Sequence, residues 1–111
     1  MAVQTARRAR PSDAGMAQFE RKASQAVALL KLLANEKRLL ILCQLVKARE
    51  VTVSDLADAV GLSQSALSQH LAKMREEGLV ATRREAQTIF YHIANADAGR
   101  LLSQLKAIYC P

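Results

Sequence analysis

The chain has 111 residues, half of them apolar, so it can form one small domain; its core must be mainly aliphatic, because only four residues are aromatic. Its formal charge of +6 is compatible with a nucleic-acid partner, but the excess lies in residues 1–50, with ten basic and four acidic residues, and residues 51–111 are neutral overall. No apolar run approaches the roughly 18–20 residues of a membrane span, which excludes a membrane-spanning protein. The first residues contain no apolar signal segment, so we expect a cytoplasmic protein.

The N-terminal half predicts a tail followed by two helices. Residues 1–15 carry three arginines among Ala, Gly, Pro and Ser without periodicity, so we expect a disordered basic tail, followed by a single domain over residues 16–111. A first helical stripe consists of Phe19, Ala23, Val27, Leu30 and Leu33. After "ANEKR", a second stripe consists of Leu39, Leu42, Cys43 and Val46. This second pattern places Cys43 on a buried helix face.

Two further helices follow, joined by "VGLSQ". In "REVTVSDLADAVG", Thr52 and Asp55 form a capping-box-like start, and Gly61 is a typical C-terminal stop. In "LSQSALSQHLAKMREEG", Ser63 is the expected N-cap and Gly78 the end. Its core stripe consists of Leu67, Leu71 and Met74. A second face is polar but nearly uncharged, and it consists of Gln64, Ser65, Ser68, Gln69 and Ala72.

The C-terminal part switches to a period of two and then returns to a helix. In "LVATRREAQTIFYHI", residues 79–83 can pair with residues 89–93 across the polar turn "REAQ". A last helix starts near Asp97 and ends at Cys110; its apolar stripe consists of Leu101, Leu105 and Ile108. The predicted fold class is therefore mainly α with a small β-hairpin, in the order ααααββα.

Two short helices with this connection predict a helix-turn-helix, and the hairpin after them makes it winged. A major groove about 12 Å wide admits one helix, and its N-terminal residues then meet base edges. Gln can pair bidentately with adenine, and Ser can donate or accept. The residues predicted to contact DNA from this helix are therefore Gln64, Ser65, Ser68 and Gln69. His70 is either a further contact to a base or phosphate or a structural residue at the edge of the core.

The hairpin carries two more candidates for DNA contact. Arg83 and Arg84 lie at its turn, where they can reach the DNA backbone or the minor groove. The alternative for both is a solvated loop.

The polar face of the second of these helices also bears on another class of function. A module for protein–protein contact would expose aromatic or aliphatic anchors there, so a face made of Gln and Ser disfavours it.

The segments "ANEKRLLILCQL", "TVSDLADAVGLSQSALSQHLAKMREEGLV" and "RREAQTIFYHI" resemble the ArsR family of bacterial winged-helix repressors. The resemblance covers nearly the whole chain from residue 18 on. It implies a homodimer formed through the first and last helices, double-stranded operator DNA with an inverted repeat as partner, and an effector that releases the DNA. A metal effector is disfavoured, because the chain lacks a Cys-x-Cys pair and has no histidine after Asp97; we expect no metal and no cofactor.

The two cysteines, one in "LLILCQL" and one in the terminal "YCP", resemble those of the persulfide-sensing branch of this family, which includes SqrR and BigR. That resemblance implies that Cys43 and Cys110 become joined by a disulfide or polysulfide, which lifts repression of sulfide-detoxification genes. Selectivity for a polysulfide would follow if the reduced Cα atoms lay about 8–10 Å apart rather than the roughly 5.5 Å of a plain disulfide. We expect Cys110 to react first and Cys43 to resolve.

Other effectors and activities remain as alternatives. The dipeptide "CP" resembles a short haem-regulatory motif, and a metal response stays open on family grounds. A thiol oxidoreductase would usually carry Cys-x-x-Cys, which this chain lacks, so no enzymatic activity is expected.

Overall fold

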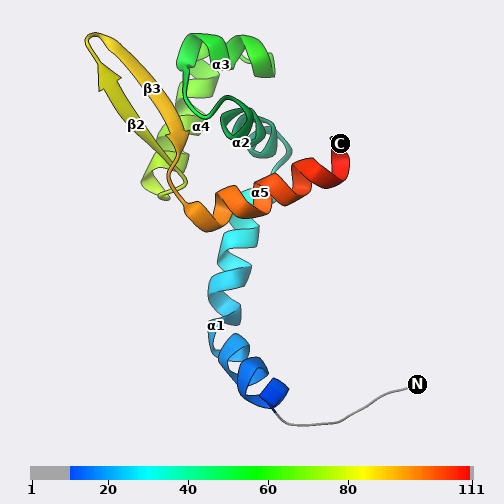
Figure 1. The fold of residues 1–111 in the computed structure, drawn as a ribbon. Coiled ribbons are helices and arrows are strands. Elements are labelled where there is room, and N and C mark those ends of the chain that lie inside the picture. Colours follow the sequence, from blue (N-terminus) through cyan, green and yellow to red (C-terminus); the bar gives the residue numbers. More distant parts are fainter. Residues whose placement is uncertain (1–10, 111) are drawn as a thin grey trace. The chain divides into compact units, whose positions relative to one another are not determined.

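The computed structural model describes residues 11–110, and it contains five helices and three strands (Figure 1). The helices are α1 (Pro11–Leu33), α2 (Glu36–Ala48), α3 (Val53–Val60), α4 (Gln64–Glu76) and α5 (Ala96–Tyr109), and the strands are β1 (Val51–Thr52), β2 (Val80–Glu85) and β3 (Thr88–Ile93). The chain divides into two compact units, one up to Leu32 and one from Leu33 onward.

The first helix starts earlier than the sequence predicted. Residues 11–15 were expected to belong to a disordered tail, but they form the first turns of α1. Pro11 is compatible with this start, because the first helical position needs no backbone N–H and favours the φ angle that proline imposes. The remaining residues of the predicted tail, 1–10, lie outside the described part of the chain.

Helices α2 to α5 each begin with a side chain that accepts a hydrogen bond from a backbone N–H three residues later. These N-caps are Asn35, Thr52, Ser63 and Asn95. For α4, the Oγ of Ser63 accepts from the N–H of Ala66 at 3.1 Å. The predicted caps at Thr52 and Ser63 are thus confirmed. Gly61 ends α3 with a φ of 71°, in the left-handed region that glycine adopts without steric cost.

The three strands form an antiparallel sheet in the order β1-β3-β2. The β2–β3 hairpin was predicted, although its strands run further than expected and leave Ala86 and Gln87 as the turn. The two-residue strand β1 was not predicted, because so short a segment carries no alternating pattern. Thr52 in β1 pairs with Phe90 in β3, and Phe90 pairs with Arg83 in β2, so these three residues form one row across the sheet.

The core of the second unit is aliphatic and lies between α2, α3, α4, α5 and the sheet. The largest side chains that are fully buried are Ile41, Leu42, Leu45, Leu56, Leu67, Leu71, Met74, Leu79, Val80 and Leu102. The predicted stripe of α4 is confirmed. The stripe of α2 was partly wrong, because Ile41 and Leu45 are buried while Cys43 is only half-buried. Helix α2 packs against α3, α5 and β3, so its buried face is wider than a single apolar stripe.

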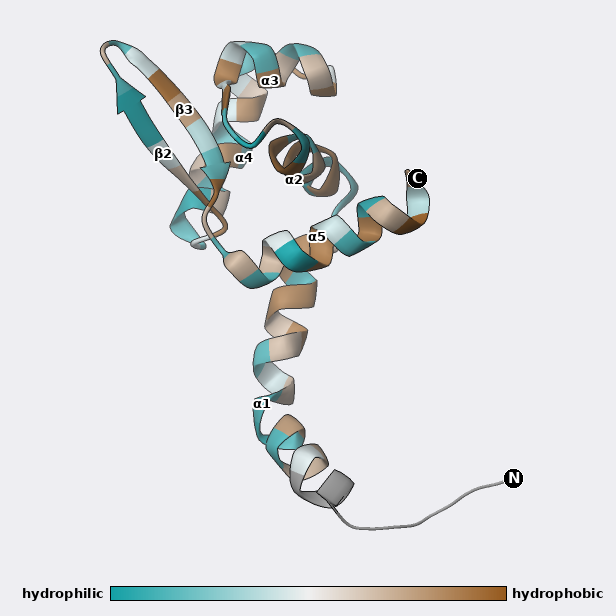
Figure 2. Cartoon of the chain, in the orientation of Figure 1, coloured by the Kyte–Doolittle hydropathy of each residue, from teal (hydrophilic) through white to brown (hydrophobic). Residues whose placement is uncertain are grey.

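Parts of the predicted apolar stripes face outward. On α5, Leu101, Ile108 and Tyr109 are exposed, and on α1 the side chains of Phe19 and Leu30 are more than half exposed. Figure 2 shows apolar segments along both helices. Among residues 11–110, no helix is both long enough and apolar enough to cross a membrane. The exposed apolar side chains of α1 and α5 do not belong to the core of either unit.

Candidate DNA-binding surface and cysteine pair

Helices α3 and α4 form the predicted helix-turn-helix. The backbone N–H groups of Gly61 and Leu62 both donate to the carbonyl oxygen of Ala57, at 2.9 and 3.1 Å, which closes the end of α3 and turns the chain sharply. The cap at Ser63 then starts α4. Helix α4 packs against α3 on one side and against β2 on another. Its orientation is therefore set both by the turn and by the hairpin.

The polar face of α4 is open to solvent. Leu67, Leu71 and Met74 occupy the buried side of the helix, and the four residues predicted to contact DNA are all exposed: Gln64, Ser65, Ser68 and Gln69. The first turn of α4 contains no acidic residue, so no side-chain charge there opposes an approaching phosphate. An exposed helix start with side-chain donors and acceptors is compatible with base readout in a major groove.

His70 lies at the edge of this surface and is half-buried next to the core residue Leu71. This position is compatible with both alternatives from the sequence, a DNA contact and a structural boundary residue. Its assignment as a DNA contact stays a prediction.

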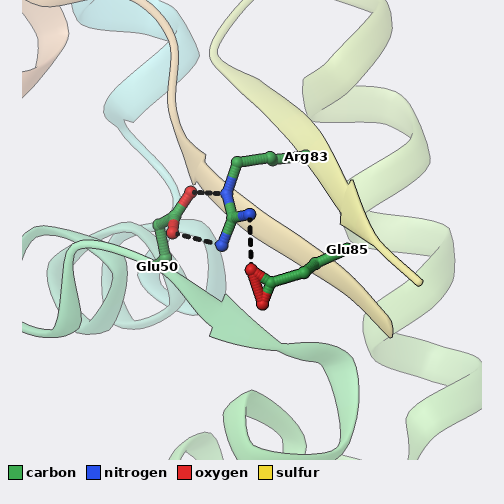
Figure 3. A network of polar contacts seen from close by, with 3 residues as sticks. All are labelled: Glu50, Arg83 and Glu85. Atoms are coloured by element: carbon green, nitrogen blue, oxygen red, sulfur yellow. Dashed lines mark hydrogen bonds and ion pairs between the residues drawn. The ribbon is translucent and has the colours of Figure 1, made fainter. Parts of the chain in front are cut away.

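The two arginines of the hairpin point to opposite faces of the sheet, because successive residues of a strand alternate. Arg83 is engaged in a network of polar contacts (Figure 3): its Nε donates to Oε2 of Glu50 at 2.9 Å and its Nη2 to Oε1 of Glu50 at 3.0 Å. Its Nη1 donates to Oε2 of Glu85 at 3.3 Å. These hydrogen bonds lower the pKa of Glu50 and raise the pKa of Arg83. The side chain of Arg84 makes no hydrogen bond or ion pair with another residue of the described range.

Cys43 lies on α2 and is half-buried, and Cys110 caps the end of α5 and is exposed; both are free thiols. Helices α2 and α5 pack against each other. Burial raises the pKa of Cys43, the negative charge of ionised Cys110 raises it further, and the positive charge of Lys106 acts in the opposite direction. The effect of Cys110 on the pKa of Cys43 agrees with the packing of α5 on α2, which brings together two helices whose cysteines are 67 positions apart in the sequence.

The raised pKa of Cys43 leads to a prediction about its reactivity. Alkylation of Cys43 by iodoacetamide should be slow at neutral pH and keep accelerating above the ordinary thiol pKa, because the reactive thiolate is a smaller fraction at each lower pH. In a Cys110→Ser variant the acceleration should begin at lower pH, since one cause of the raised pKa is gone. Quantitative mass spectrometry of the Cys43 peptide measures both rates, and a native rate that levels off below the ordinary thiol pKa would contradict the prediction.

Sequence reasoning missed two ion pairs that hold this region together. Nη1 of Arg38, at the start of α2, lies 2.8 Å from Oε1 of Glu77, which caps the end of α4. Glu50 and Arg83 form the second pair across 33 positions. No local signal marks either pair, because each partner looks like an ordinary surface charge in its own segment. Among residues 11–110, no group of three or more His, Cys, Asp or Glu side chains is arranged to hold a metal ion.

The comparisons with known proteins all point to the same family. A family model described as "Bacterial regulatory protein, arsR family" matches residues 35–82. The chain is 47% identical over 96 residues to the HTH-type transcriptional regulator YgaV of Escherichia coli (strain K12), which covers 86% of this chain and 97% of YgaV. Among solved structures, reduced HlyU from Vibrio cholerae N16961 has a TM-score of 0.76 and 47% identity, over 85% of this chain and 98% of HlyU.

The transcriptional repressor BigR from Xylella fastidiosa also has a TM-score of 0.76, with 38% identity over 86% of this chain and 97% of BigR. These relatives are described as a transcriptional regulator, an activator and a repressor rather than as enzymes, and the winged helix-turn-helix described above has the same architecture as the solved structures. The chain therefore belongs to the ArsR family of DNA-binding bacterial transcriptional regulators.

Proposed function

We propose that this ArsR-family regulator is a cytoplasmic repressor that senses persulfides by forming a disulfide or polysulfide bridge between Cys43 and Cys110, and that the bridge releases operator DNA. The observation that carries the proposal is the packing of α5, which ends at Cys110, on α2, which contains Cys43. The pKa of Cys43, raised by burial and further by Cys110, agrees with it. The names of two relatives add support, since one is a repressor and another is known in a reduced form. Genes for sulfide detoxification are the targets that this chemistry would serve.

The proposed DNA surface is the exposed polar face of α4 together with the hairpin. Gln64, Ser65, Ser68 and Gln69 would read base edges, with His70 at the margin. Arg84 would contact a phosphate from the wing, since no other residue of the described range holds its guanidinium. The operator would be an inverted repeat, because a symmetric dimer presents the same surface twice.

The proposed dimer would form through α1 and α5. Phe19, Val27 and Leu30 on α1 and Ile108 and Tyr109 on α5 are exposed apolar side chains, and apolar patches of this kind are typical of protein interfaces. In such a dimer the two copies of α4 must lie about 34–36 Å apart, so that they reach successive turns on one face of the DNA. Because Cys110 ends α5, a bridge to α2 would join the proposed interface directly to the core behind α4.

The proposed chemistry balances with a low-molecular-weight persulfide, RSSH, as sulfur donor and oxidant. A thiolate of the protein attacks the outer sulfur of RSSH, which releases RSH and leaves a protein persulfide. Attack of the second protein thiolate on the inner sulfur of that persulfide releases H₂S and forms a disulfide. A tetrasulfide bridge needs three RSSH in total and releases three RSH and one H₂S. The exposed Cys110 would meet the donor first, and Cys43 would resolve.

Intact-mass measurement of the reduced protein after exposure to glutathione persulfide tests this function. A bridged tetrasulfide is expected to appear as a gain of two sulfur atoms with a loss of two hydrogens, and a plain disulfide as the loss of two hydrogens alone. Neither product should form in a Cys43→Ser or a Cys110→Ser variant, which can only gain single sulfurs or dimerise through one thiol. An unchanged mass of the native protein would overturn the proposal.

A further inference from the structure

The contact between Glu50 and Arg83 spans the whole width of the small sheet. Glu50 directly precedes β1 at one edge, Arg83 belongs to β2 at the other edge, and β3 lies between them. The guanidinium of Arg83 crosses the ring of Phe90 in β3, with 4.9 Å from its central carbon to the ring centroid, and donates two hydrogen bonds to the carboxylate of Glu50. Such a fork-shaped, two-bond pair fixes direction as well as distance.

This contact holds a part of the hairpin that the core does not hold. Val80, at the start of β2, is 2% exposed, but Arg83, Arg84 and Glu85 are exposed, and Figure 1 shows the turn projecting away from the helices. The other end of the contact is Glu50, two residues before Thr52, which caps α3. The row Arg83–Phe90–Thr52 therefore connects the outer hairpin to the first residue of the helix-turn-helix.

We infer that Arg83 is a positioning residue for DNA binding: its bidentate pair with Glu50 sets the direction of the wing relative to α3 and α4, and it makes no phosphate contact of its own. This inference rests on the proposed role of the wing in contacting DNA. The sequence predicted DNA contact for both Arg83 and Arg84, whereas this inference gives the two arginines different roles. Arg84, on the opposite face of the same strand, would supply the phosphate contact.

The sign of one mutational effect separates this role from a direct contact. If Arg83 binds phosphate and Glu50 merely competes for it, Glu50→Gln releases the guanidinium, removes a negative charge and strengthens DNA binding. If the pair positions the wing, Glu50→Gln weakens binding, because Gln replaces one of the two acceptor oxygens with an NH₂ donor, which would face an N–H donor of Arg83 and break the two-bond fork. Asp58→Asn, an exposed acidic residue of α3, is a matched control for simple removal of negative charge.

The experiment measures affinity by fluorescence anisotropy at several salt concentrations, with reduced protein and an inverted-repeat duplex selected by the native protein from a random pool. Glu50→Gln and Arg83→Gln are each expected to weaken binding about three- to tenfold, and the double variant no more than either one, since both break the same contact. The slope of log K against log salt should stay native for Glu50→Gln, whereas Arg84→Gln should reduce it by about 0.9 per lost phosphate contact.

Hydrogen exchange of the β2–β3 amides provides a readout without DNA, and it should accelerate in Glu50→Gln but not in Asp58→Asn. Thermal unfolding of each variant establishes that the second unit stays folded. Tighter binding by Glu50→Gln, or an Arg83→Gln variant that weakens binding alone and lowers the salt slope, would overturn the inference. Because the protein is kept reduced, the outcome does not depend on the cysteine chemistry; failure of the native protein to select any duplex would instead count against the proposed function.

Discussion

Persulfide treatment is expected to weaken operator binding by the native protein about 5- to 150-fold, the range of a typical coupling free energy between two sites. Cys43→Ser and Cys110→Ser should each retain the affinity of the reduced protein after the same treatment. The physical reason is that a bridge needs both sulfurs, so that either variant can gain sulfur on one thiol without joining α2 to α5. Anisotropy titrations with one operator duplex, before and after treatment, measure the effect.

The expected route of this effect runs through the packing of α2. Cys43 lies in the middle of α2, and Arg38 at the start of the same helix is paired with Glu77 at the end of α4. A bridge that draws Cys43 toward the end of α5 would displace α2, and the ion pair would pass part of that displacement to α4. In a dimer, a small change in the direction of α4 also changes the spacing of the two half-site contacts.

Two controls make the result specific. Dithiothreitol should restore binding by the treated native protein, because it reduces disulfides and polysulfides alike. Treatment with iodoacetamide blocks both thiols without bridging them, and binding should then change less than with persulfide. Equal weakening of the native protein and both serine variants by persulfide would remove the cysteine pair from the mechanism and leave a repressor with another effector.

A Gln64→Ala/Gln69→Ala double variant is expected to lose about 2–6 kcal/mol of specific binding, since one bidentate contact between a side chain and a base contributes about 1–3 kcal/mol. Both side chains are exposed on α4 and neither contributes to the core, so the thermal unfolding midpoint should change little. Affinity for a scrambled duplex should also change little, because phosphate contacts dominate non-specific binding. Titration of the operator and scrambled duplexes in parallel gives the specificity ratio directly.

Gln44→Ala is a suitable control for this double variant. Gln44 lies on α2, outside the helix-turn-helix and the hairpin, and its removal should leave the specificity ratio unchanged. Retention of full specificity by the Gln64→Ala/Gln69→Ala variant would show that another surface reads the operator. A parallel fall in affinity for both duplexes would mean that the two glutamines contribute only to general DNA contact.

The sequence by itself determined the features whose causes are local. The start of α4 follows from Ser63, because its hydroxyl bonds to a backbone N–H three residues later. The buried stripe Leu67–Leu71–Met74 and the polar face beside it both follow from the 3.6-residue period of the same helix. The positions that define these features are at most four residues from the next one along the chain, so a linear pattern is enough to predict them. The family resemblance added the fold and the role of the cysteines as expectations.

Tertiary structure alone decided the features that depend on distant partners. The strand β1 exists because β3 lies beside it, and two residues could not form a strand without that neighbour. Leu101 and Ile108 follow a helical stripe as regular as that of α4, yet they stay exposed because no described element of their unit covers them. Arg83 and Arg84 are adjacent and chemically identical, but only Arg83 meets Glu50. Burial and pairing are set by which surfaces folding brings together, and that information is absent from any one segment.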